Sequence, residues 1–235
     1  MSGDYCSRFI TENDDYQKDF IFTLPDSWWS RQYEYAWASG FADPGDRALD
    51  AASGIEHPLK FYLLDRCREC YACDVDERIV SREAIRAALA EKIGEEAAFS
   101  FPDRYFDKIN YSRASLEQLP YPDKFFDKIY CISVLEHLPD VFKKRPWTWP
   151  FRRFLPFVDR LVEASLAEFR RVLKDNGQIV LTFDYPRINL DYLRMLLPEL
   201  GLEFHGPVDY LLPGNAVHSA VHRLHCFRTV LRKCG

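Results

Sequence analysis

From residue 47 onward, short apolar runs alternate with longer segments in which apolar residues recur at helical spacing. Short apolar runs bounded by turn residues are typical of buried strands, and the helical repeat is typical of helices that cover a sheet. The predicted strands are Ala48–Ala52, Glu69–Asp74, Lys108–Tyr111, Phe126–Ser133, Gln178–Asp184, Leu202–Pro207 and His222–Leu231. The predicted helices are His57–Arg68, Val80–Ile93, a short one near Leu135, Phe157–Lys174 and Asn189–Leu200.

This alternation predicts an α/β fold, with a Rossmann-like, seven-stranded, mostly parallel sheet, helices on both faces and an antiparallel last strand. Asp175-Asn176-Gly177 provides a helix stop and a turn before the fifth strand. Residues 1–46 are polar and aromatic, and we expect them to form an N-terminal cap or lid. Residues 47–235 form the predicted core, with an insertion at about 139–156 that is rich in Trp, Phe, Pro and basic residues.

The first predicted strand ends in a turn of small residues, Ala52-Ser53-Gly54, and the second ends at Asp74. A small-residue turn lets the backbone approach a ligand closely, and an acid at the end of the next strand accepts hydrogen bonds from ribose hydroxyls. These two features predict a nucleoside site. The turn lacks the glycine series that cradles a pyrophosphate, and Asp50 lies inside the strand before it, so an amino-bearing or cationic nucleoside fits better than a dinucleotide.

Composition narrows the choice of partner and compartment. The 235 residues are 47% hydrophobic, which suffices for one sizeable core. The net charge is -5 and no basic block stands out, which disfavours a nucleic-acid surface. The N-terminus has no signal-peptide pattern, no apolar run approaches a membrane span, and the seven cysteines are an odd number, so we expect a cytoplasmic protein with free thiols. These features leave the oligomeric state open.

Three further motifs follow the nucleoside-type turn in order: Leu119-Pro120-Tyr121, Phe126-Asp127 and Leu135-Glu136-His137-Leu138. With the turn and the acid, this order resembles the class I S-adenosylmethionine-dependent methyltransferases, in particular their small-molecule branch. The resemblance covers about Arg47 to Pro186. No single motif is specific, and the resemblance rests on their order and spacing.

The resemblance implies S-adenosylmethionine as cofactor and S-adenosylhomocysteine as product. It implies that the methionine moiety lies against the turn, the ribose against Asp74, and the adenine between Val75 and the segment at Ser115. The cofactor-binding residues implied in this way are Asp50, Ala52, Gly54, Asp74, Val75, Ser115, Leu116, Ser133 and Val134. The family usually has Asp where Ser115 stands, and Asp76 is an alternative ribose ligand.

The turn departs from the Gly-x-Gly-x-Gly pattern of the family at two positions, Ala52 and Glu56. Alanine is a small change, whereas Glu56 is a larger one. His57-Pro58 then begins the helix with proline in its first turn, as helices allow. Weaker cofactor binding, a reshaped turn and a loss of binding are alternatives that the residues leave open.

His137 is the catalytic candidate, because an imidazole of near-neutral pKa can accept a proton from a hydroxyl or amine. A structural or helix-capping role is the alternative. Methyl transfer to an acceptor that is already nucleophilic needs alignment more than a base. The acceptor-site and lid candidates are Arg31, Tyr33, Tyr35, Trp147, Trp149, Arg152 and Tyr185, with Arg31 as a partner for the cofactor carboxylate.

The insertion has three interpretations: a solvated loop, a cover over the acceptor, or a contact with a membrane surface. We expect no metal site in the chain. Cys67, Cys70 and Cys73 have CxxCxxC spacing, but they fall on a helix end and a strand and are not expected to converge. His222 and His225 are expected to face opposite sides of a strand.

The sequence therefore predicts an enzyme that transfers a methyl group from S-adenosylmethionine to an oxygen, nitrogen or carbon atom of a small-molecule acceptor. A non-catalytic binding protein with the same fold is the first alternative. The second is a methyltransferase that acts on RNA or protein, which the acidic composition disfavours.

Overall fold

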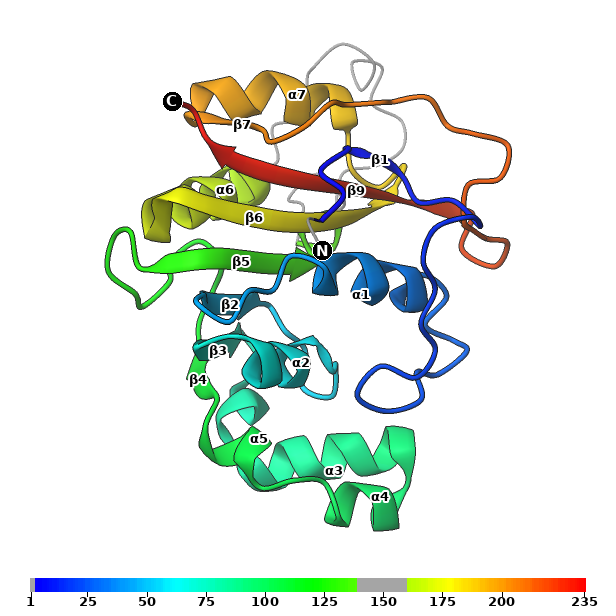
Figure 1. Ribbon diagram of the computed structural model, residues 1–235, viewed down its shortest axis with the longest axis vertical. Helices are drawn as coiled ribbons and strands as arrows, with labels where there is room; N and C mark the ends of the chain where they lie inside the picture. Colours follow the sequence, from blue (N-terminus) through cyan, green and yellow to red (C-terminus); the bar gives the residue numbers. More distant parts are fainter. Residues whose placement is uncertain (1–2, 139–159) are drawn as a thin grey trace, which may run out of the picture.

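The computed structural model describes residues 3–138 and 160–235, which form a twisted sheet with helices on both faces (Figure 1). Its strands are β1 (Arg8–Phe9), β2 (Arg47–Ala51), β3 (Glu69–Asp74), β4 (Asn110–Arg113), β5 (Phe126–Ile132), β6 (Leu173–Tyr185), β7 (Leu202–Phe204), β8 (His218–Ser219) and β9 (Leu224–Lys233). Its α-helices are α1 (Arg31–Ser39), α2 (Leu59–Arg66), α3 (Arg82–Ile93), α4 (Glu95–Phe99), α5 (Arg104–Asp107), α6 (Arg160–Val172) and α7 (Leu190–Glu199), and the short 3-10 helices are η1 (Glu77–Val80) and η2 (Leu135–His137).

The strands follow the order β1-β9-β6-β5-β2-β3-β4, and β7 and β8 also pair with β9. The five consecutive strands β4, β3, β2, β5 and β6 are parallel to one another, whereas β9 is antiparallel to β6. The predicted fold class is therefore confirmed. The described sheet has nine strands rather than seven. The two additional strands, β1 and β8, have two residues each, which is too short for an alternating pattern to reveal them.

Side chains alternate between the two faces of the central strands, as the pleat requires. In β5, Ile129 and Cys131 belong to one hydrophobic core, and Tyr130 and Ile132 belong to the other. Helices α6 and α7 cover the first face, and α1, α2 and α3 cover the second. Burial on both faces explains why these strands read as continuous apolar runs in the sequence.

The predicted turn at Asp175–Gly177 falls within the extent of β6. The ladder is irregular there, because Phe126 of β5 pairs with Leu173, whereas Lys128 pairs with Gln178. The intervening residues therefore bulge out of the pairing. Gly177 is needed at this point, since a Cβ would come within 2.7 Å of the Leu173 side chain.

The N-terminal 46 residues are joined to the sheet as well as to the helical layer. Strand β1 pairs with β9, with Arg8 opposite Arg228. Helix α1 lies beside the ends of the central strands (Figure 1). The whole predicted insertion, with Trp147, Trp149 and Arg152, lies outside the described residues. In the part of the chain that is described, no helix combines the length and the apolar character that crossing a membrane requires.

Candidate active site

The carboxyl ends of the parallel strands meet at one edge of the sheet, on the side where α1 lies (Figure 1). The β2–β3 register places Ala51 opposite Cys73, and the Ser53 amide donates to the Cys73 carbonyl at 2.9 Å. The small-residue turn after β2 therefore lies directly beside Asp74 at the end of β3. Ligands of open α/β sheets bind at such an edge.

The turn has the backbone conformation of a glycine-rich loop although it contains a single glycine. Ala52 and Gly54 have φ angles of 52° and 62°. A Cβ on Gly54 would approach His57 Cδ2 to 2.6 Å, so this glycine is required. Ala52 has a side chain in the left-handed region, which costs roughly 1 kcal/mol. The chain therefore keeps this left-handed turn although alanine at position 52 destabilises it.

Glu56, which stands at the last glycine position of the family pattern, does not fill the turn. Its carboxylate lies 3.7 Å from Lys92 Nζ on α3. The side chain therefore extends toward the outer helix and away from the strand ends. Of the alternatives left open by the sequence, this geometry favours a reshaped turn that can still accept a ligand.

Asp74 and Asp76, the two candidate ribose ligands, differ in what they already bind. Asp74 accepts the Gly54 amide at 2.9 Å and the Asp76 amide at 3.0 Å, one on each oxygen. Each oxygen keeps a second lone pair for a hydroxyl group. Asp76 instead pairs with Arg78, whose guanidinium contacts both of its oxygens. Asp74 therefore has acceptor capacity free for a ligand, whereas both oxygens of Asp76 are engaged by Arg78.

Asp50, on β2 just before the turn, links the strand to the first turn of α2. It is 3% exposed and accepts a hydrogen bond from the Lys60 backbone, so it lies at the N-terminus of α2. Lys60 is fully buried, and its ammonium group donates to the carbonyls of Gly54 and His57 at 2.8 and 2.6 Å. Burial raises the pKa of Asp50, and the charge of Lys60 opposes that rise. Lys60 was not anticipated from the sequence, where it looked like one more polar residue of a helix.

Glu34 on α1 joins the N-terminal segment to the strand ends. It is fully buried and accepts hydrogen bonds from the hydroxyls of Ser133 at 2.6 Å and Thr182 at 2.5 Å. Further donors to its carboxylate are Ser30, Arg31 and the Cys226 thiol. Burial would raise the pKa of Glu34, but Arg31 and the two hydroxyls outweigh burial and lower it. Glu34 therefore stays ionised, and sequence reasoning missed it.

The lid candidates of the N-terminal segment take different positions. Arg31 pairs with Glu34 through one guanidinium nitrogen, and its side chain is 18% exposed. Arg31 also interacts electrostatically with Asp50 and Glu136, so its guanidinium lies near the carboxyl ends of the strands. Tyr35 is buried, and its hydroxyl lies 2.7 Å from His57 Nδ1. Tyr33 packs against the small core formed by Ile10, Val217 and Cys226.

The residues expected near the adenine and the acceptor are dispersed along the same edge. Val75 is 64% exposed just beyond Asp74, which suits a flat ring. The Ser115 hydroxyl donates to Glu117 at 3.2 Å, whereas Leu116 is buried in the core. Ser133 already uses its hydroxyl and its amide on Glu34 and Thr182. Val134 and Tyr185 are half-buried against the first core.

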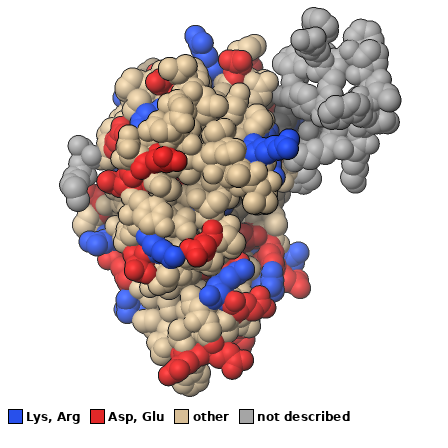
Figure 2. Space-filling model, turned by 90° about the vertical axis from the view of Figure 1, so that its right-hand side faces the viewer, with Lys and Arg blue, Asp and Glu red and all other residues tan. Residues whose placement is uncertain are grey.

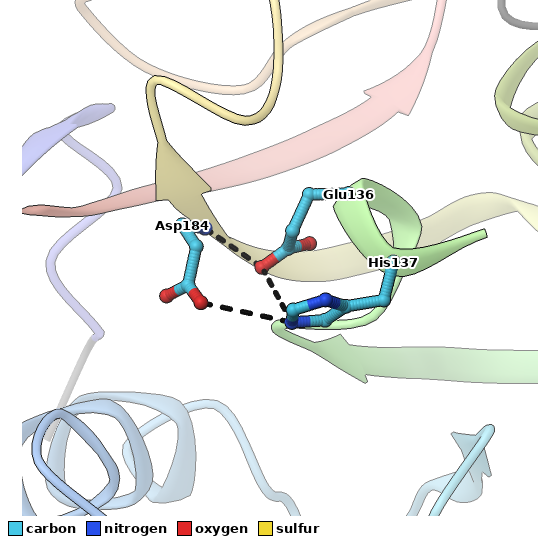
Figure 3. A group of neighbouring side chains, drawn as sticks. All are labelled: Glu136, His137 and Asp184. Atoms are coloured by element: carbon cyan, nitrogen blue, oxygen red, sulfur yellow. Dashed lines mark hydrogen bonds and ion pairs between the residues drawn. The ribbon is translucent and has the colours of Figure 1, made fainter. Parts of the chain in front are cut away.

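Glu136, His137 and Asp184 converge at the ends of β5 and β6 (Figure 3). Glu136 accepts the Asp184 amide at 2.7 Å, and burial raises the pKa of Glu136 to about 7. His137 Nε2 lies 3.6 Å from an Asp184 carboxylate oxygen, and its Nδ1 lies 3.2 Å from Arg187 Nη1. Since a guanidinium only donates, Nδ1 accepts and Nε2 carries the ring proton. This tautomer disfavours His137 as a general base.

Among the described residues, Cys67, Cys70 and Cys73 do not come together as a possible metal site, and neither do His222 and His225. There, the only group of three ligand-type side chains within 4.8 Å is Glu136, His137 and Asp184. The seven cysteines are all free. The ring centroids of His218 and His225 lie 4.6 Å apart across the β8–β9 pair, with the rings tilted by 32°.

Charges of both signs are interspersed over the surface to which the carboxyl ends of β5 and β6 point (Figure 2). Lys and Arg side chains alternate there with Asp and Glu, and they form no continuous basic area in this view. A surface of this kind offers little electrostatic attraction for a polyanion.

Known proteins with the same fold include methyltransferases and a cyclase. A TehB-like S-adenosylmethionine-dependent methyltransferase from Corynebacterium glutamicum shows 18% identity and a TM-score of 0.51, covering 85% of this chain and 86% of that chain. The 1,6-didemethyltoxoflavin-N1-methyltransferase of Burkholderia thailandensis, solved with its substrate and S-adenosylhomocysteine, shows 15% identity and a TM-score of 0.55, covering 89% and 82%. The [4+2]-cyclase SpnF shows 15% identity and a TM-score of 0.57, covering 96% and 89%.

The comparison of sequences is more specific about the family. Residues 49–144 match the model of a methyltransferase domain, and this stretch contains the turn, Asp74 and the strand β5 with its following motif. No protein of curated function matches the chain. The matched residues include the carboxyl ends of β2, β3 and β5, which meet at this edge of the sheet. The methyltransferases with this fold use S-adenosylmethionine as cofactor. Residues 49–144 therefore carry a methyltransferase domain, within a fold that the chain shares with S-adenosylmethionine-dependent methyltransferases.

Proposed function

We propose that this methyltransferase modifies an oxygen, nitrogen or carbon atom of a small-molecule acceptor at the carboxyl ends of β5 and β6. The observation that carries this proposal is the position of α1. Glu34 ties this helix to Ser133 and Thr182 by hydrogen bonds of 2.6 and 2.5 Å, so the N-terminal segment caps the strand ends. A site capped by its own chain favours a small acceptor over a macromolecule.

The residues at the turn fit S-adenosylmethionine, which supplies a methyl group on an electrophilic sulfonium. Asp74 would accept hydrogen bonds from the ribose hydroxyls, with Val75 against the adenine and Ser115 and Leu116 at its edge. The backbone of Ala52 and Gly54 would line the methionine moiety, because one residue has only a methyl side chain and the other has none, which lets a ligand approach the backbone closely.

Arg31 would bind the carboxylate of the methionine moiety. One of its guanidinium nitrogens is held by Glu34, which fixes the side chain while the other nitrogens remain available. A guanidinium presents its donors in a planar fork that matches a carboxylate. Asp50 would act on the cofactor through the turn that it supports.

Two further observations support a small acceptor. The surface at the strand ends carries mixed charges (Figure 2), which does not favour RNA. The Burkholderia thailandensis neighbour is a methyltransferase of a small heterocycle, as its name states. The cyclase among the neighbours shows that this fold also hosts other chemistry, so the fold alone does not define the acceptor.

Tyr185 at the end of β6, and Trp147, Trp149 and Arg152 in the insertion, remain our candidates for contact with the acceptor. An acceptor that is nucleophilic at neutral pH would need alignment by these residues and no general base. This is consistent with the tautomer of His137, which leaves no lone pair on Nε2.

The proposal is tested with S-adenosylmethionine that carries a labelled methyl group. The protein is incubated with three fractions of a cell extract: metabolites below about 1 kDa, RNA, and protein. We expect the label in the metabolite fraction, and at least about fivefold less label with Asp74→Ala at a subsaturating concentration of S-adenosylmethionine, a comparison that also controls for other enzymes. Label in RNA or protein would overturn the small-molecule acceptor, and no transfer to any fraction would favour a non-catalytic binding protein.

A further inference from the structure

Asp184 has a carboxylate that no hydrogen bond satisfies in the described part of the chain. It is 6% exposed, and its Oδ1 atom is buried without a partner. Its Oδ2 atom makes long ion-pair contacts with His137 Nε2 at 3.6 Å and with the exposed Arg187 Nη1 at 3.9 Å, and neither contact is short enough for a hydrogen bond. Burying an ionised carboxylate without donors is unfavourable, so such a group calls for a cation.

Two neighbouring side chains face the same space as Asp184 Oδ2 (Figure 3). Glu136 Oε1 lies 4.0 Å from His137 Nε2, and the three ligand atoms lie within 4.8 Å of one another. These separations are too long for hydrogen bonds. The separations of 3.6 and 4.0 Å from His137 Nε2 are those of ligands on one ion, since two atoms each about 2.1 Å from a metal lie roughly 3 to 4 Å apart, and the two carboxylates would close any remaining excess by small side-chain rotations.

We propose that Glu136, His137 and Asp184 bind one divalent metal ion at the carboxyl ends of β5 and β6. Two carboxylates and one imidazole suit ions that accept both oxygen and nitrogen ligands, such as Mn²⁺ and Zn²⁺. The charge of Arg31 does not neutralise this group, because Arg31 is already paired with Glu34. Three protein ligands leave open positions for water or for an oxygen of the acceptor, and this last role alone rests on the proposed function.

Arg187 competes with the ion for His137. A metal on Nε2 needs the lone pair of that atom, so the ring proton must move to Nδ1, where Arg187 Nη1 now donates at 3.2 Å. The Arg187 side chain is 43% exposed and can turn into solvent. The proton moves between ring nitrogens through water, with no net gain or loss. Removing the guanidinium should therefore strengthen metal binding.

The site is tested by titrating metal-free protein with MnCl₂ and with ZnCl₂, in the absence of any cofactor. Electron paramagnetic resonance follows free Mn²⁺, and calorimetry follows Zn²⁺. We expect one ion per chain for at least one of the two metals. Asp184→Asn and His137→Ala should each weaken binding at least tenfold, and Arg187→Gln, whose amide oxygen can accept the Nδ1 proton, should strengthen it severalfold.

Asp26→Asn is the matched control, because the Asp26 side chain is 85% exposed and far from the strand ends along the chain; this variant should bind like the original protein. If Asp184→Asn does not fold, His137→Ala carries the test, since that side chain is 46% exposed. No saturable binding of either ion at millimolar concentration, or equal binding by His137→Ala, would overturn the proposal. Binding of S-adenosylhomocysteine, measured separately without metal, distinguishes a failure of this site from a failure of the cofactor site.

Discussion

The carboxylate of Glu34 accepts a hydrogen bond from the hydroxyl of Ser133 at 2.6 Å, although the two residues are 99 positions apart in the sequence. The contact joins the helix before the sheet to the end of β5. Glu34 and Thr182 are fully buried, and the Arg31 side chain, which pairs with Glu34, is 18% exposed. The N-terminal segment is therefore held against the candidate active site by a charged, buried contact.

Glu34→Gln should lower the free energy of unfolding by roughly 2 to 4 kcal/mol, because Arg31 loses its buried counterion. Ser133→Ala removes one of several donors and should cost only about 1 kcal/mol. Urea denaturation of both variants measures the difference. A Glu34→Gln protein as stable as the Ser133→Ala protein would show that the charge contributes nothing to this contact.

Ala52→Gly should stabilise the protein by about 1 kcal/mol, because the residue has a φ of 52°. Ala36→Gly in the middle of α1 is the control of opposite sign, with an expected loss of about 1 kcal/mol. Thermal unfolding of the two variants measures both effects. Destabilisation by Ala52→Gly would mean that the turn is not left-handed in solution.

Asp14 should make the protein sensitive to acid. Burial raises its pKa, but hydrogen bonds from Arg8 and Thr11 and the charge of Arg228 outweigh burial and lower the pKa to about 2. A lowered carboxyl pKa stabilises the fold above the unfolded-state pKa, near 4, and this stabilisation is lost as the pH falls toward 2. Asp14→Asn should thus be less stable by about 2 kcal/mol at pH 7.

The stability difference between the original protein and Asp14→Asn should shrink steadily between about pH 5 and pH 2. Chemical denaturation at several pH values measures it. A difference that stays constant over this range would show that the Asp14 carboxylate does not change its pKa on folding.

Arg31→Lys should weaken binding of S-adenosylmethionine about tenfold, because lysine keeps the charge opposite Glu34 but loses the planar fork. The same variant should bind 5′-methylthioadenosine, which lacks the amino-acid carboxylate, as the original protein does. Calorimetry with the two ligands separates these effects. An equal loss for both ligands would assign Arg31 to the fold and not to the carboxylate.

Elements with a clear period were predictable from the sequence, and long-range polar contacts were not. The strand Glu69–Asp74 was predicted with its observed bounds, and α3 begins two residues later than predicted because Ser81 caps it. Nothing local distinguishes Glu34 or Lys60 from exposed residues of an amphipathic helix. Their burial depends on which hydroxyls and carbonyls the sheet brings to them.

Within the candidate site, too, residues at the ends of periodic elements were predictable and long-range contacts were not. Asp74 and Gly54 were predictable, since each ends a strand or a turn whose position follows from the pattern. The convergence of Glu136 and Asp184 was not, because it depends on the pairing of β5 with β6 across 48 residues. Strand β1 was missed since its two residues gain their pairing from β9 alone.

Calorimetric titration with S-adenosylhomocysteine tests the central claim, that the turn and Asp74 hold the cofactor, most directly. The original protein should bind one equivalent. Asp74→Ala should weaken binding by roughly 1 to 3 kcal/mol, the scale of lost charged hydrogen bonds, and Asp76→Ala should leave it nearly unchanged. No binding at millimolar ligand, or an equal loss in the two variants, would contradict the account.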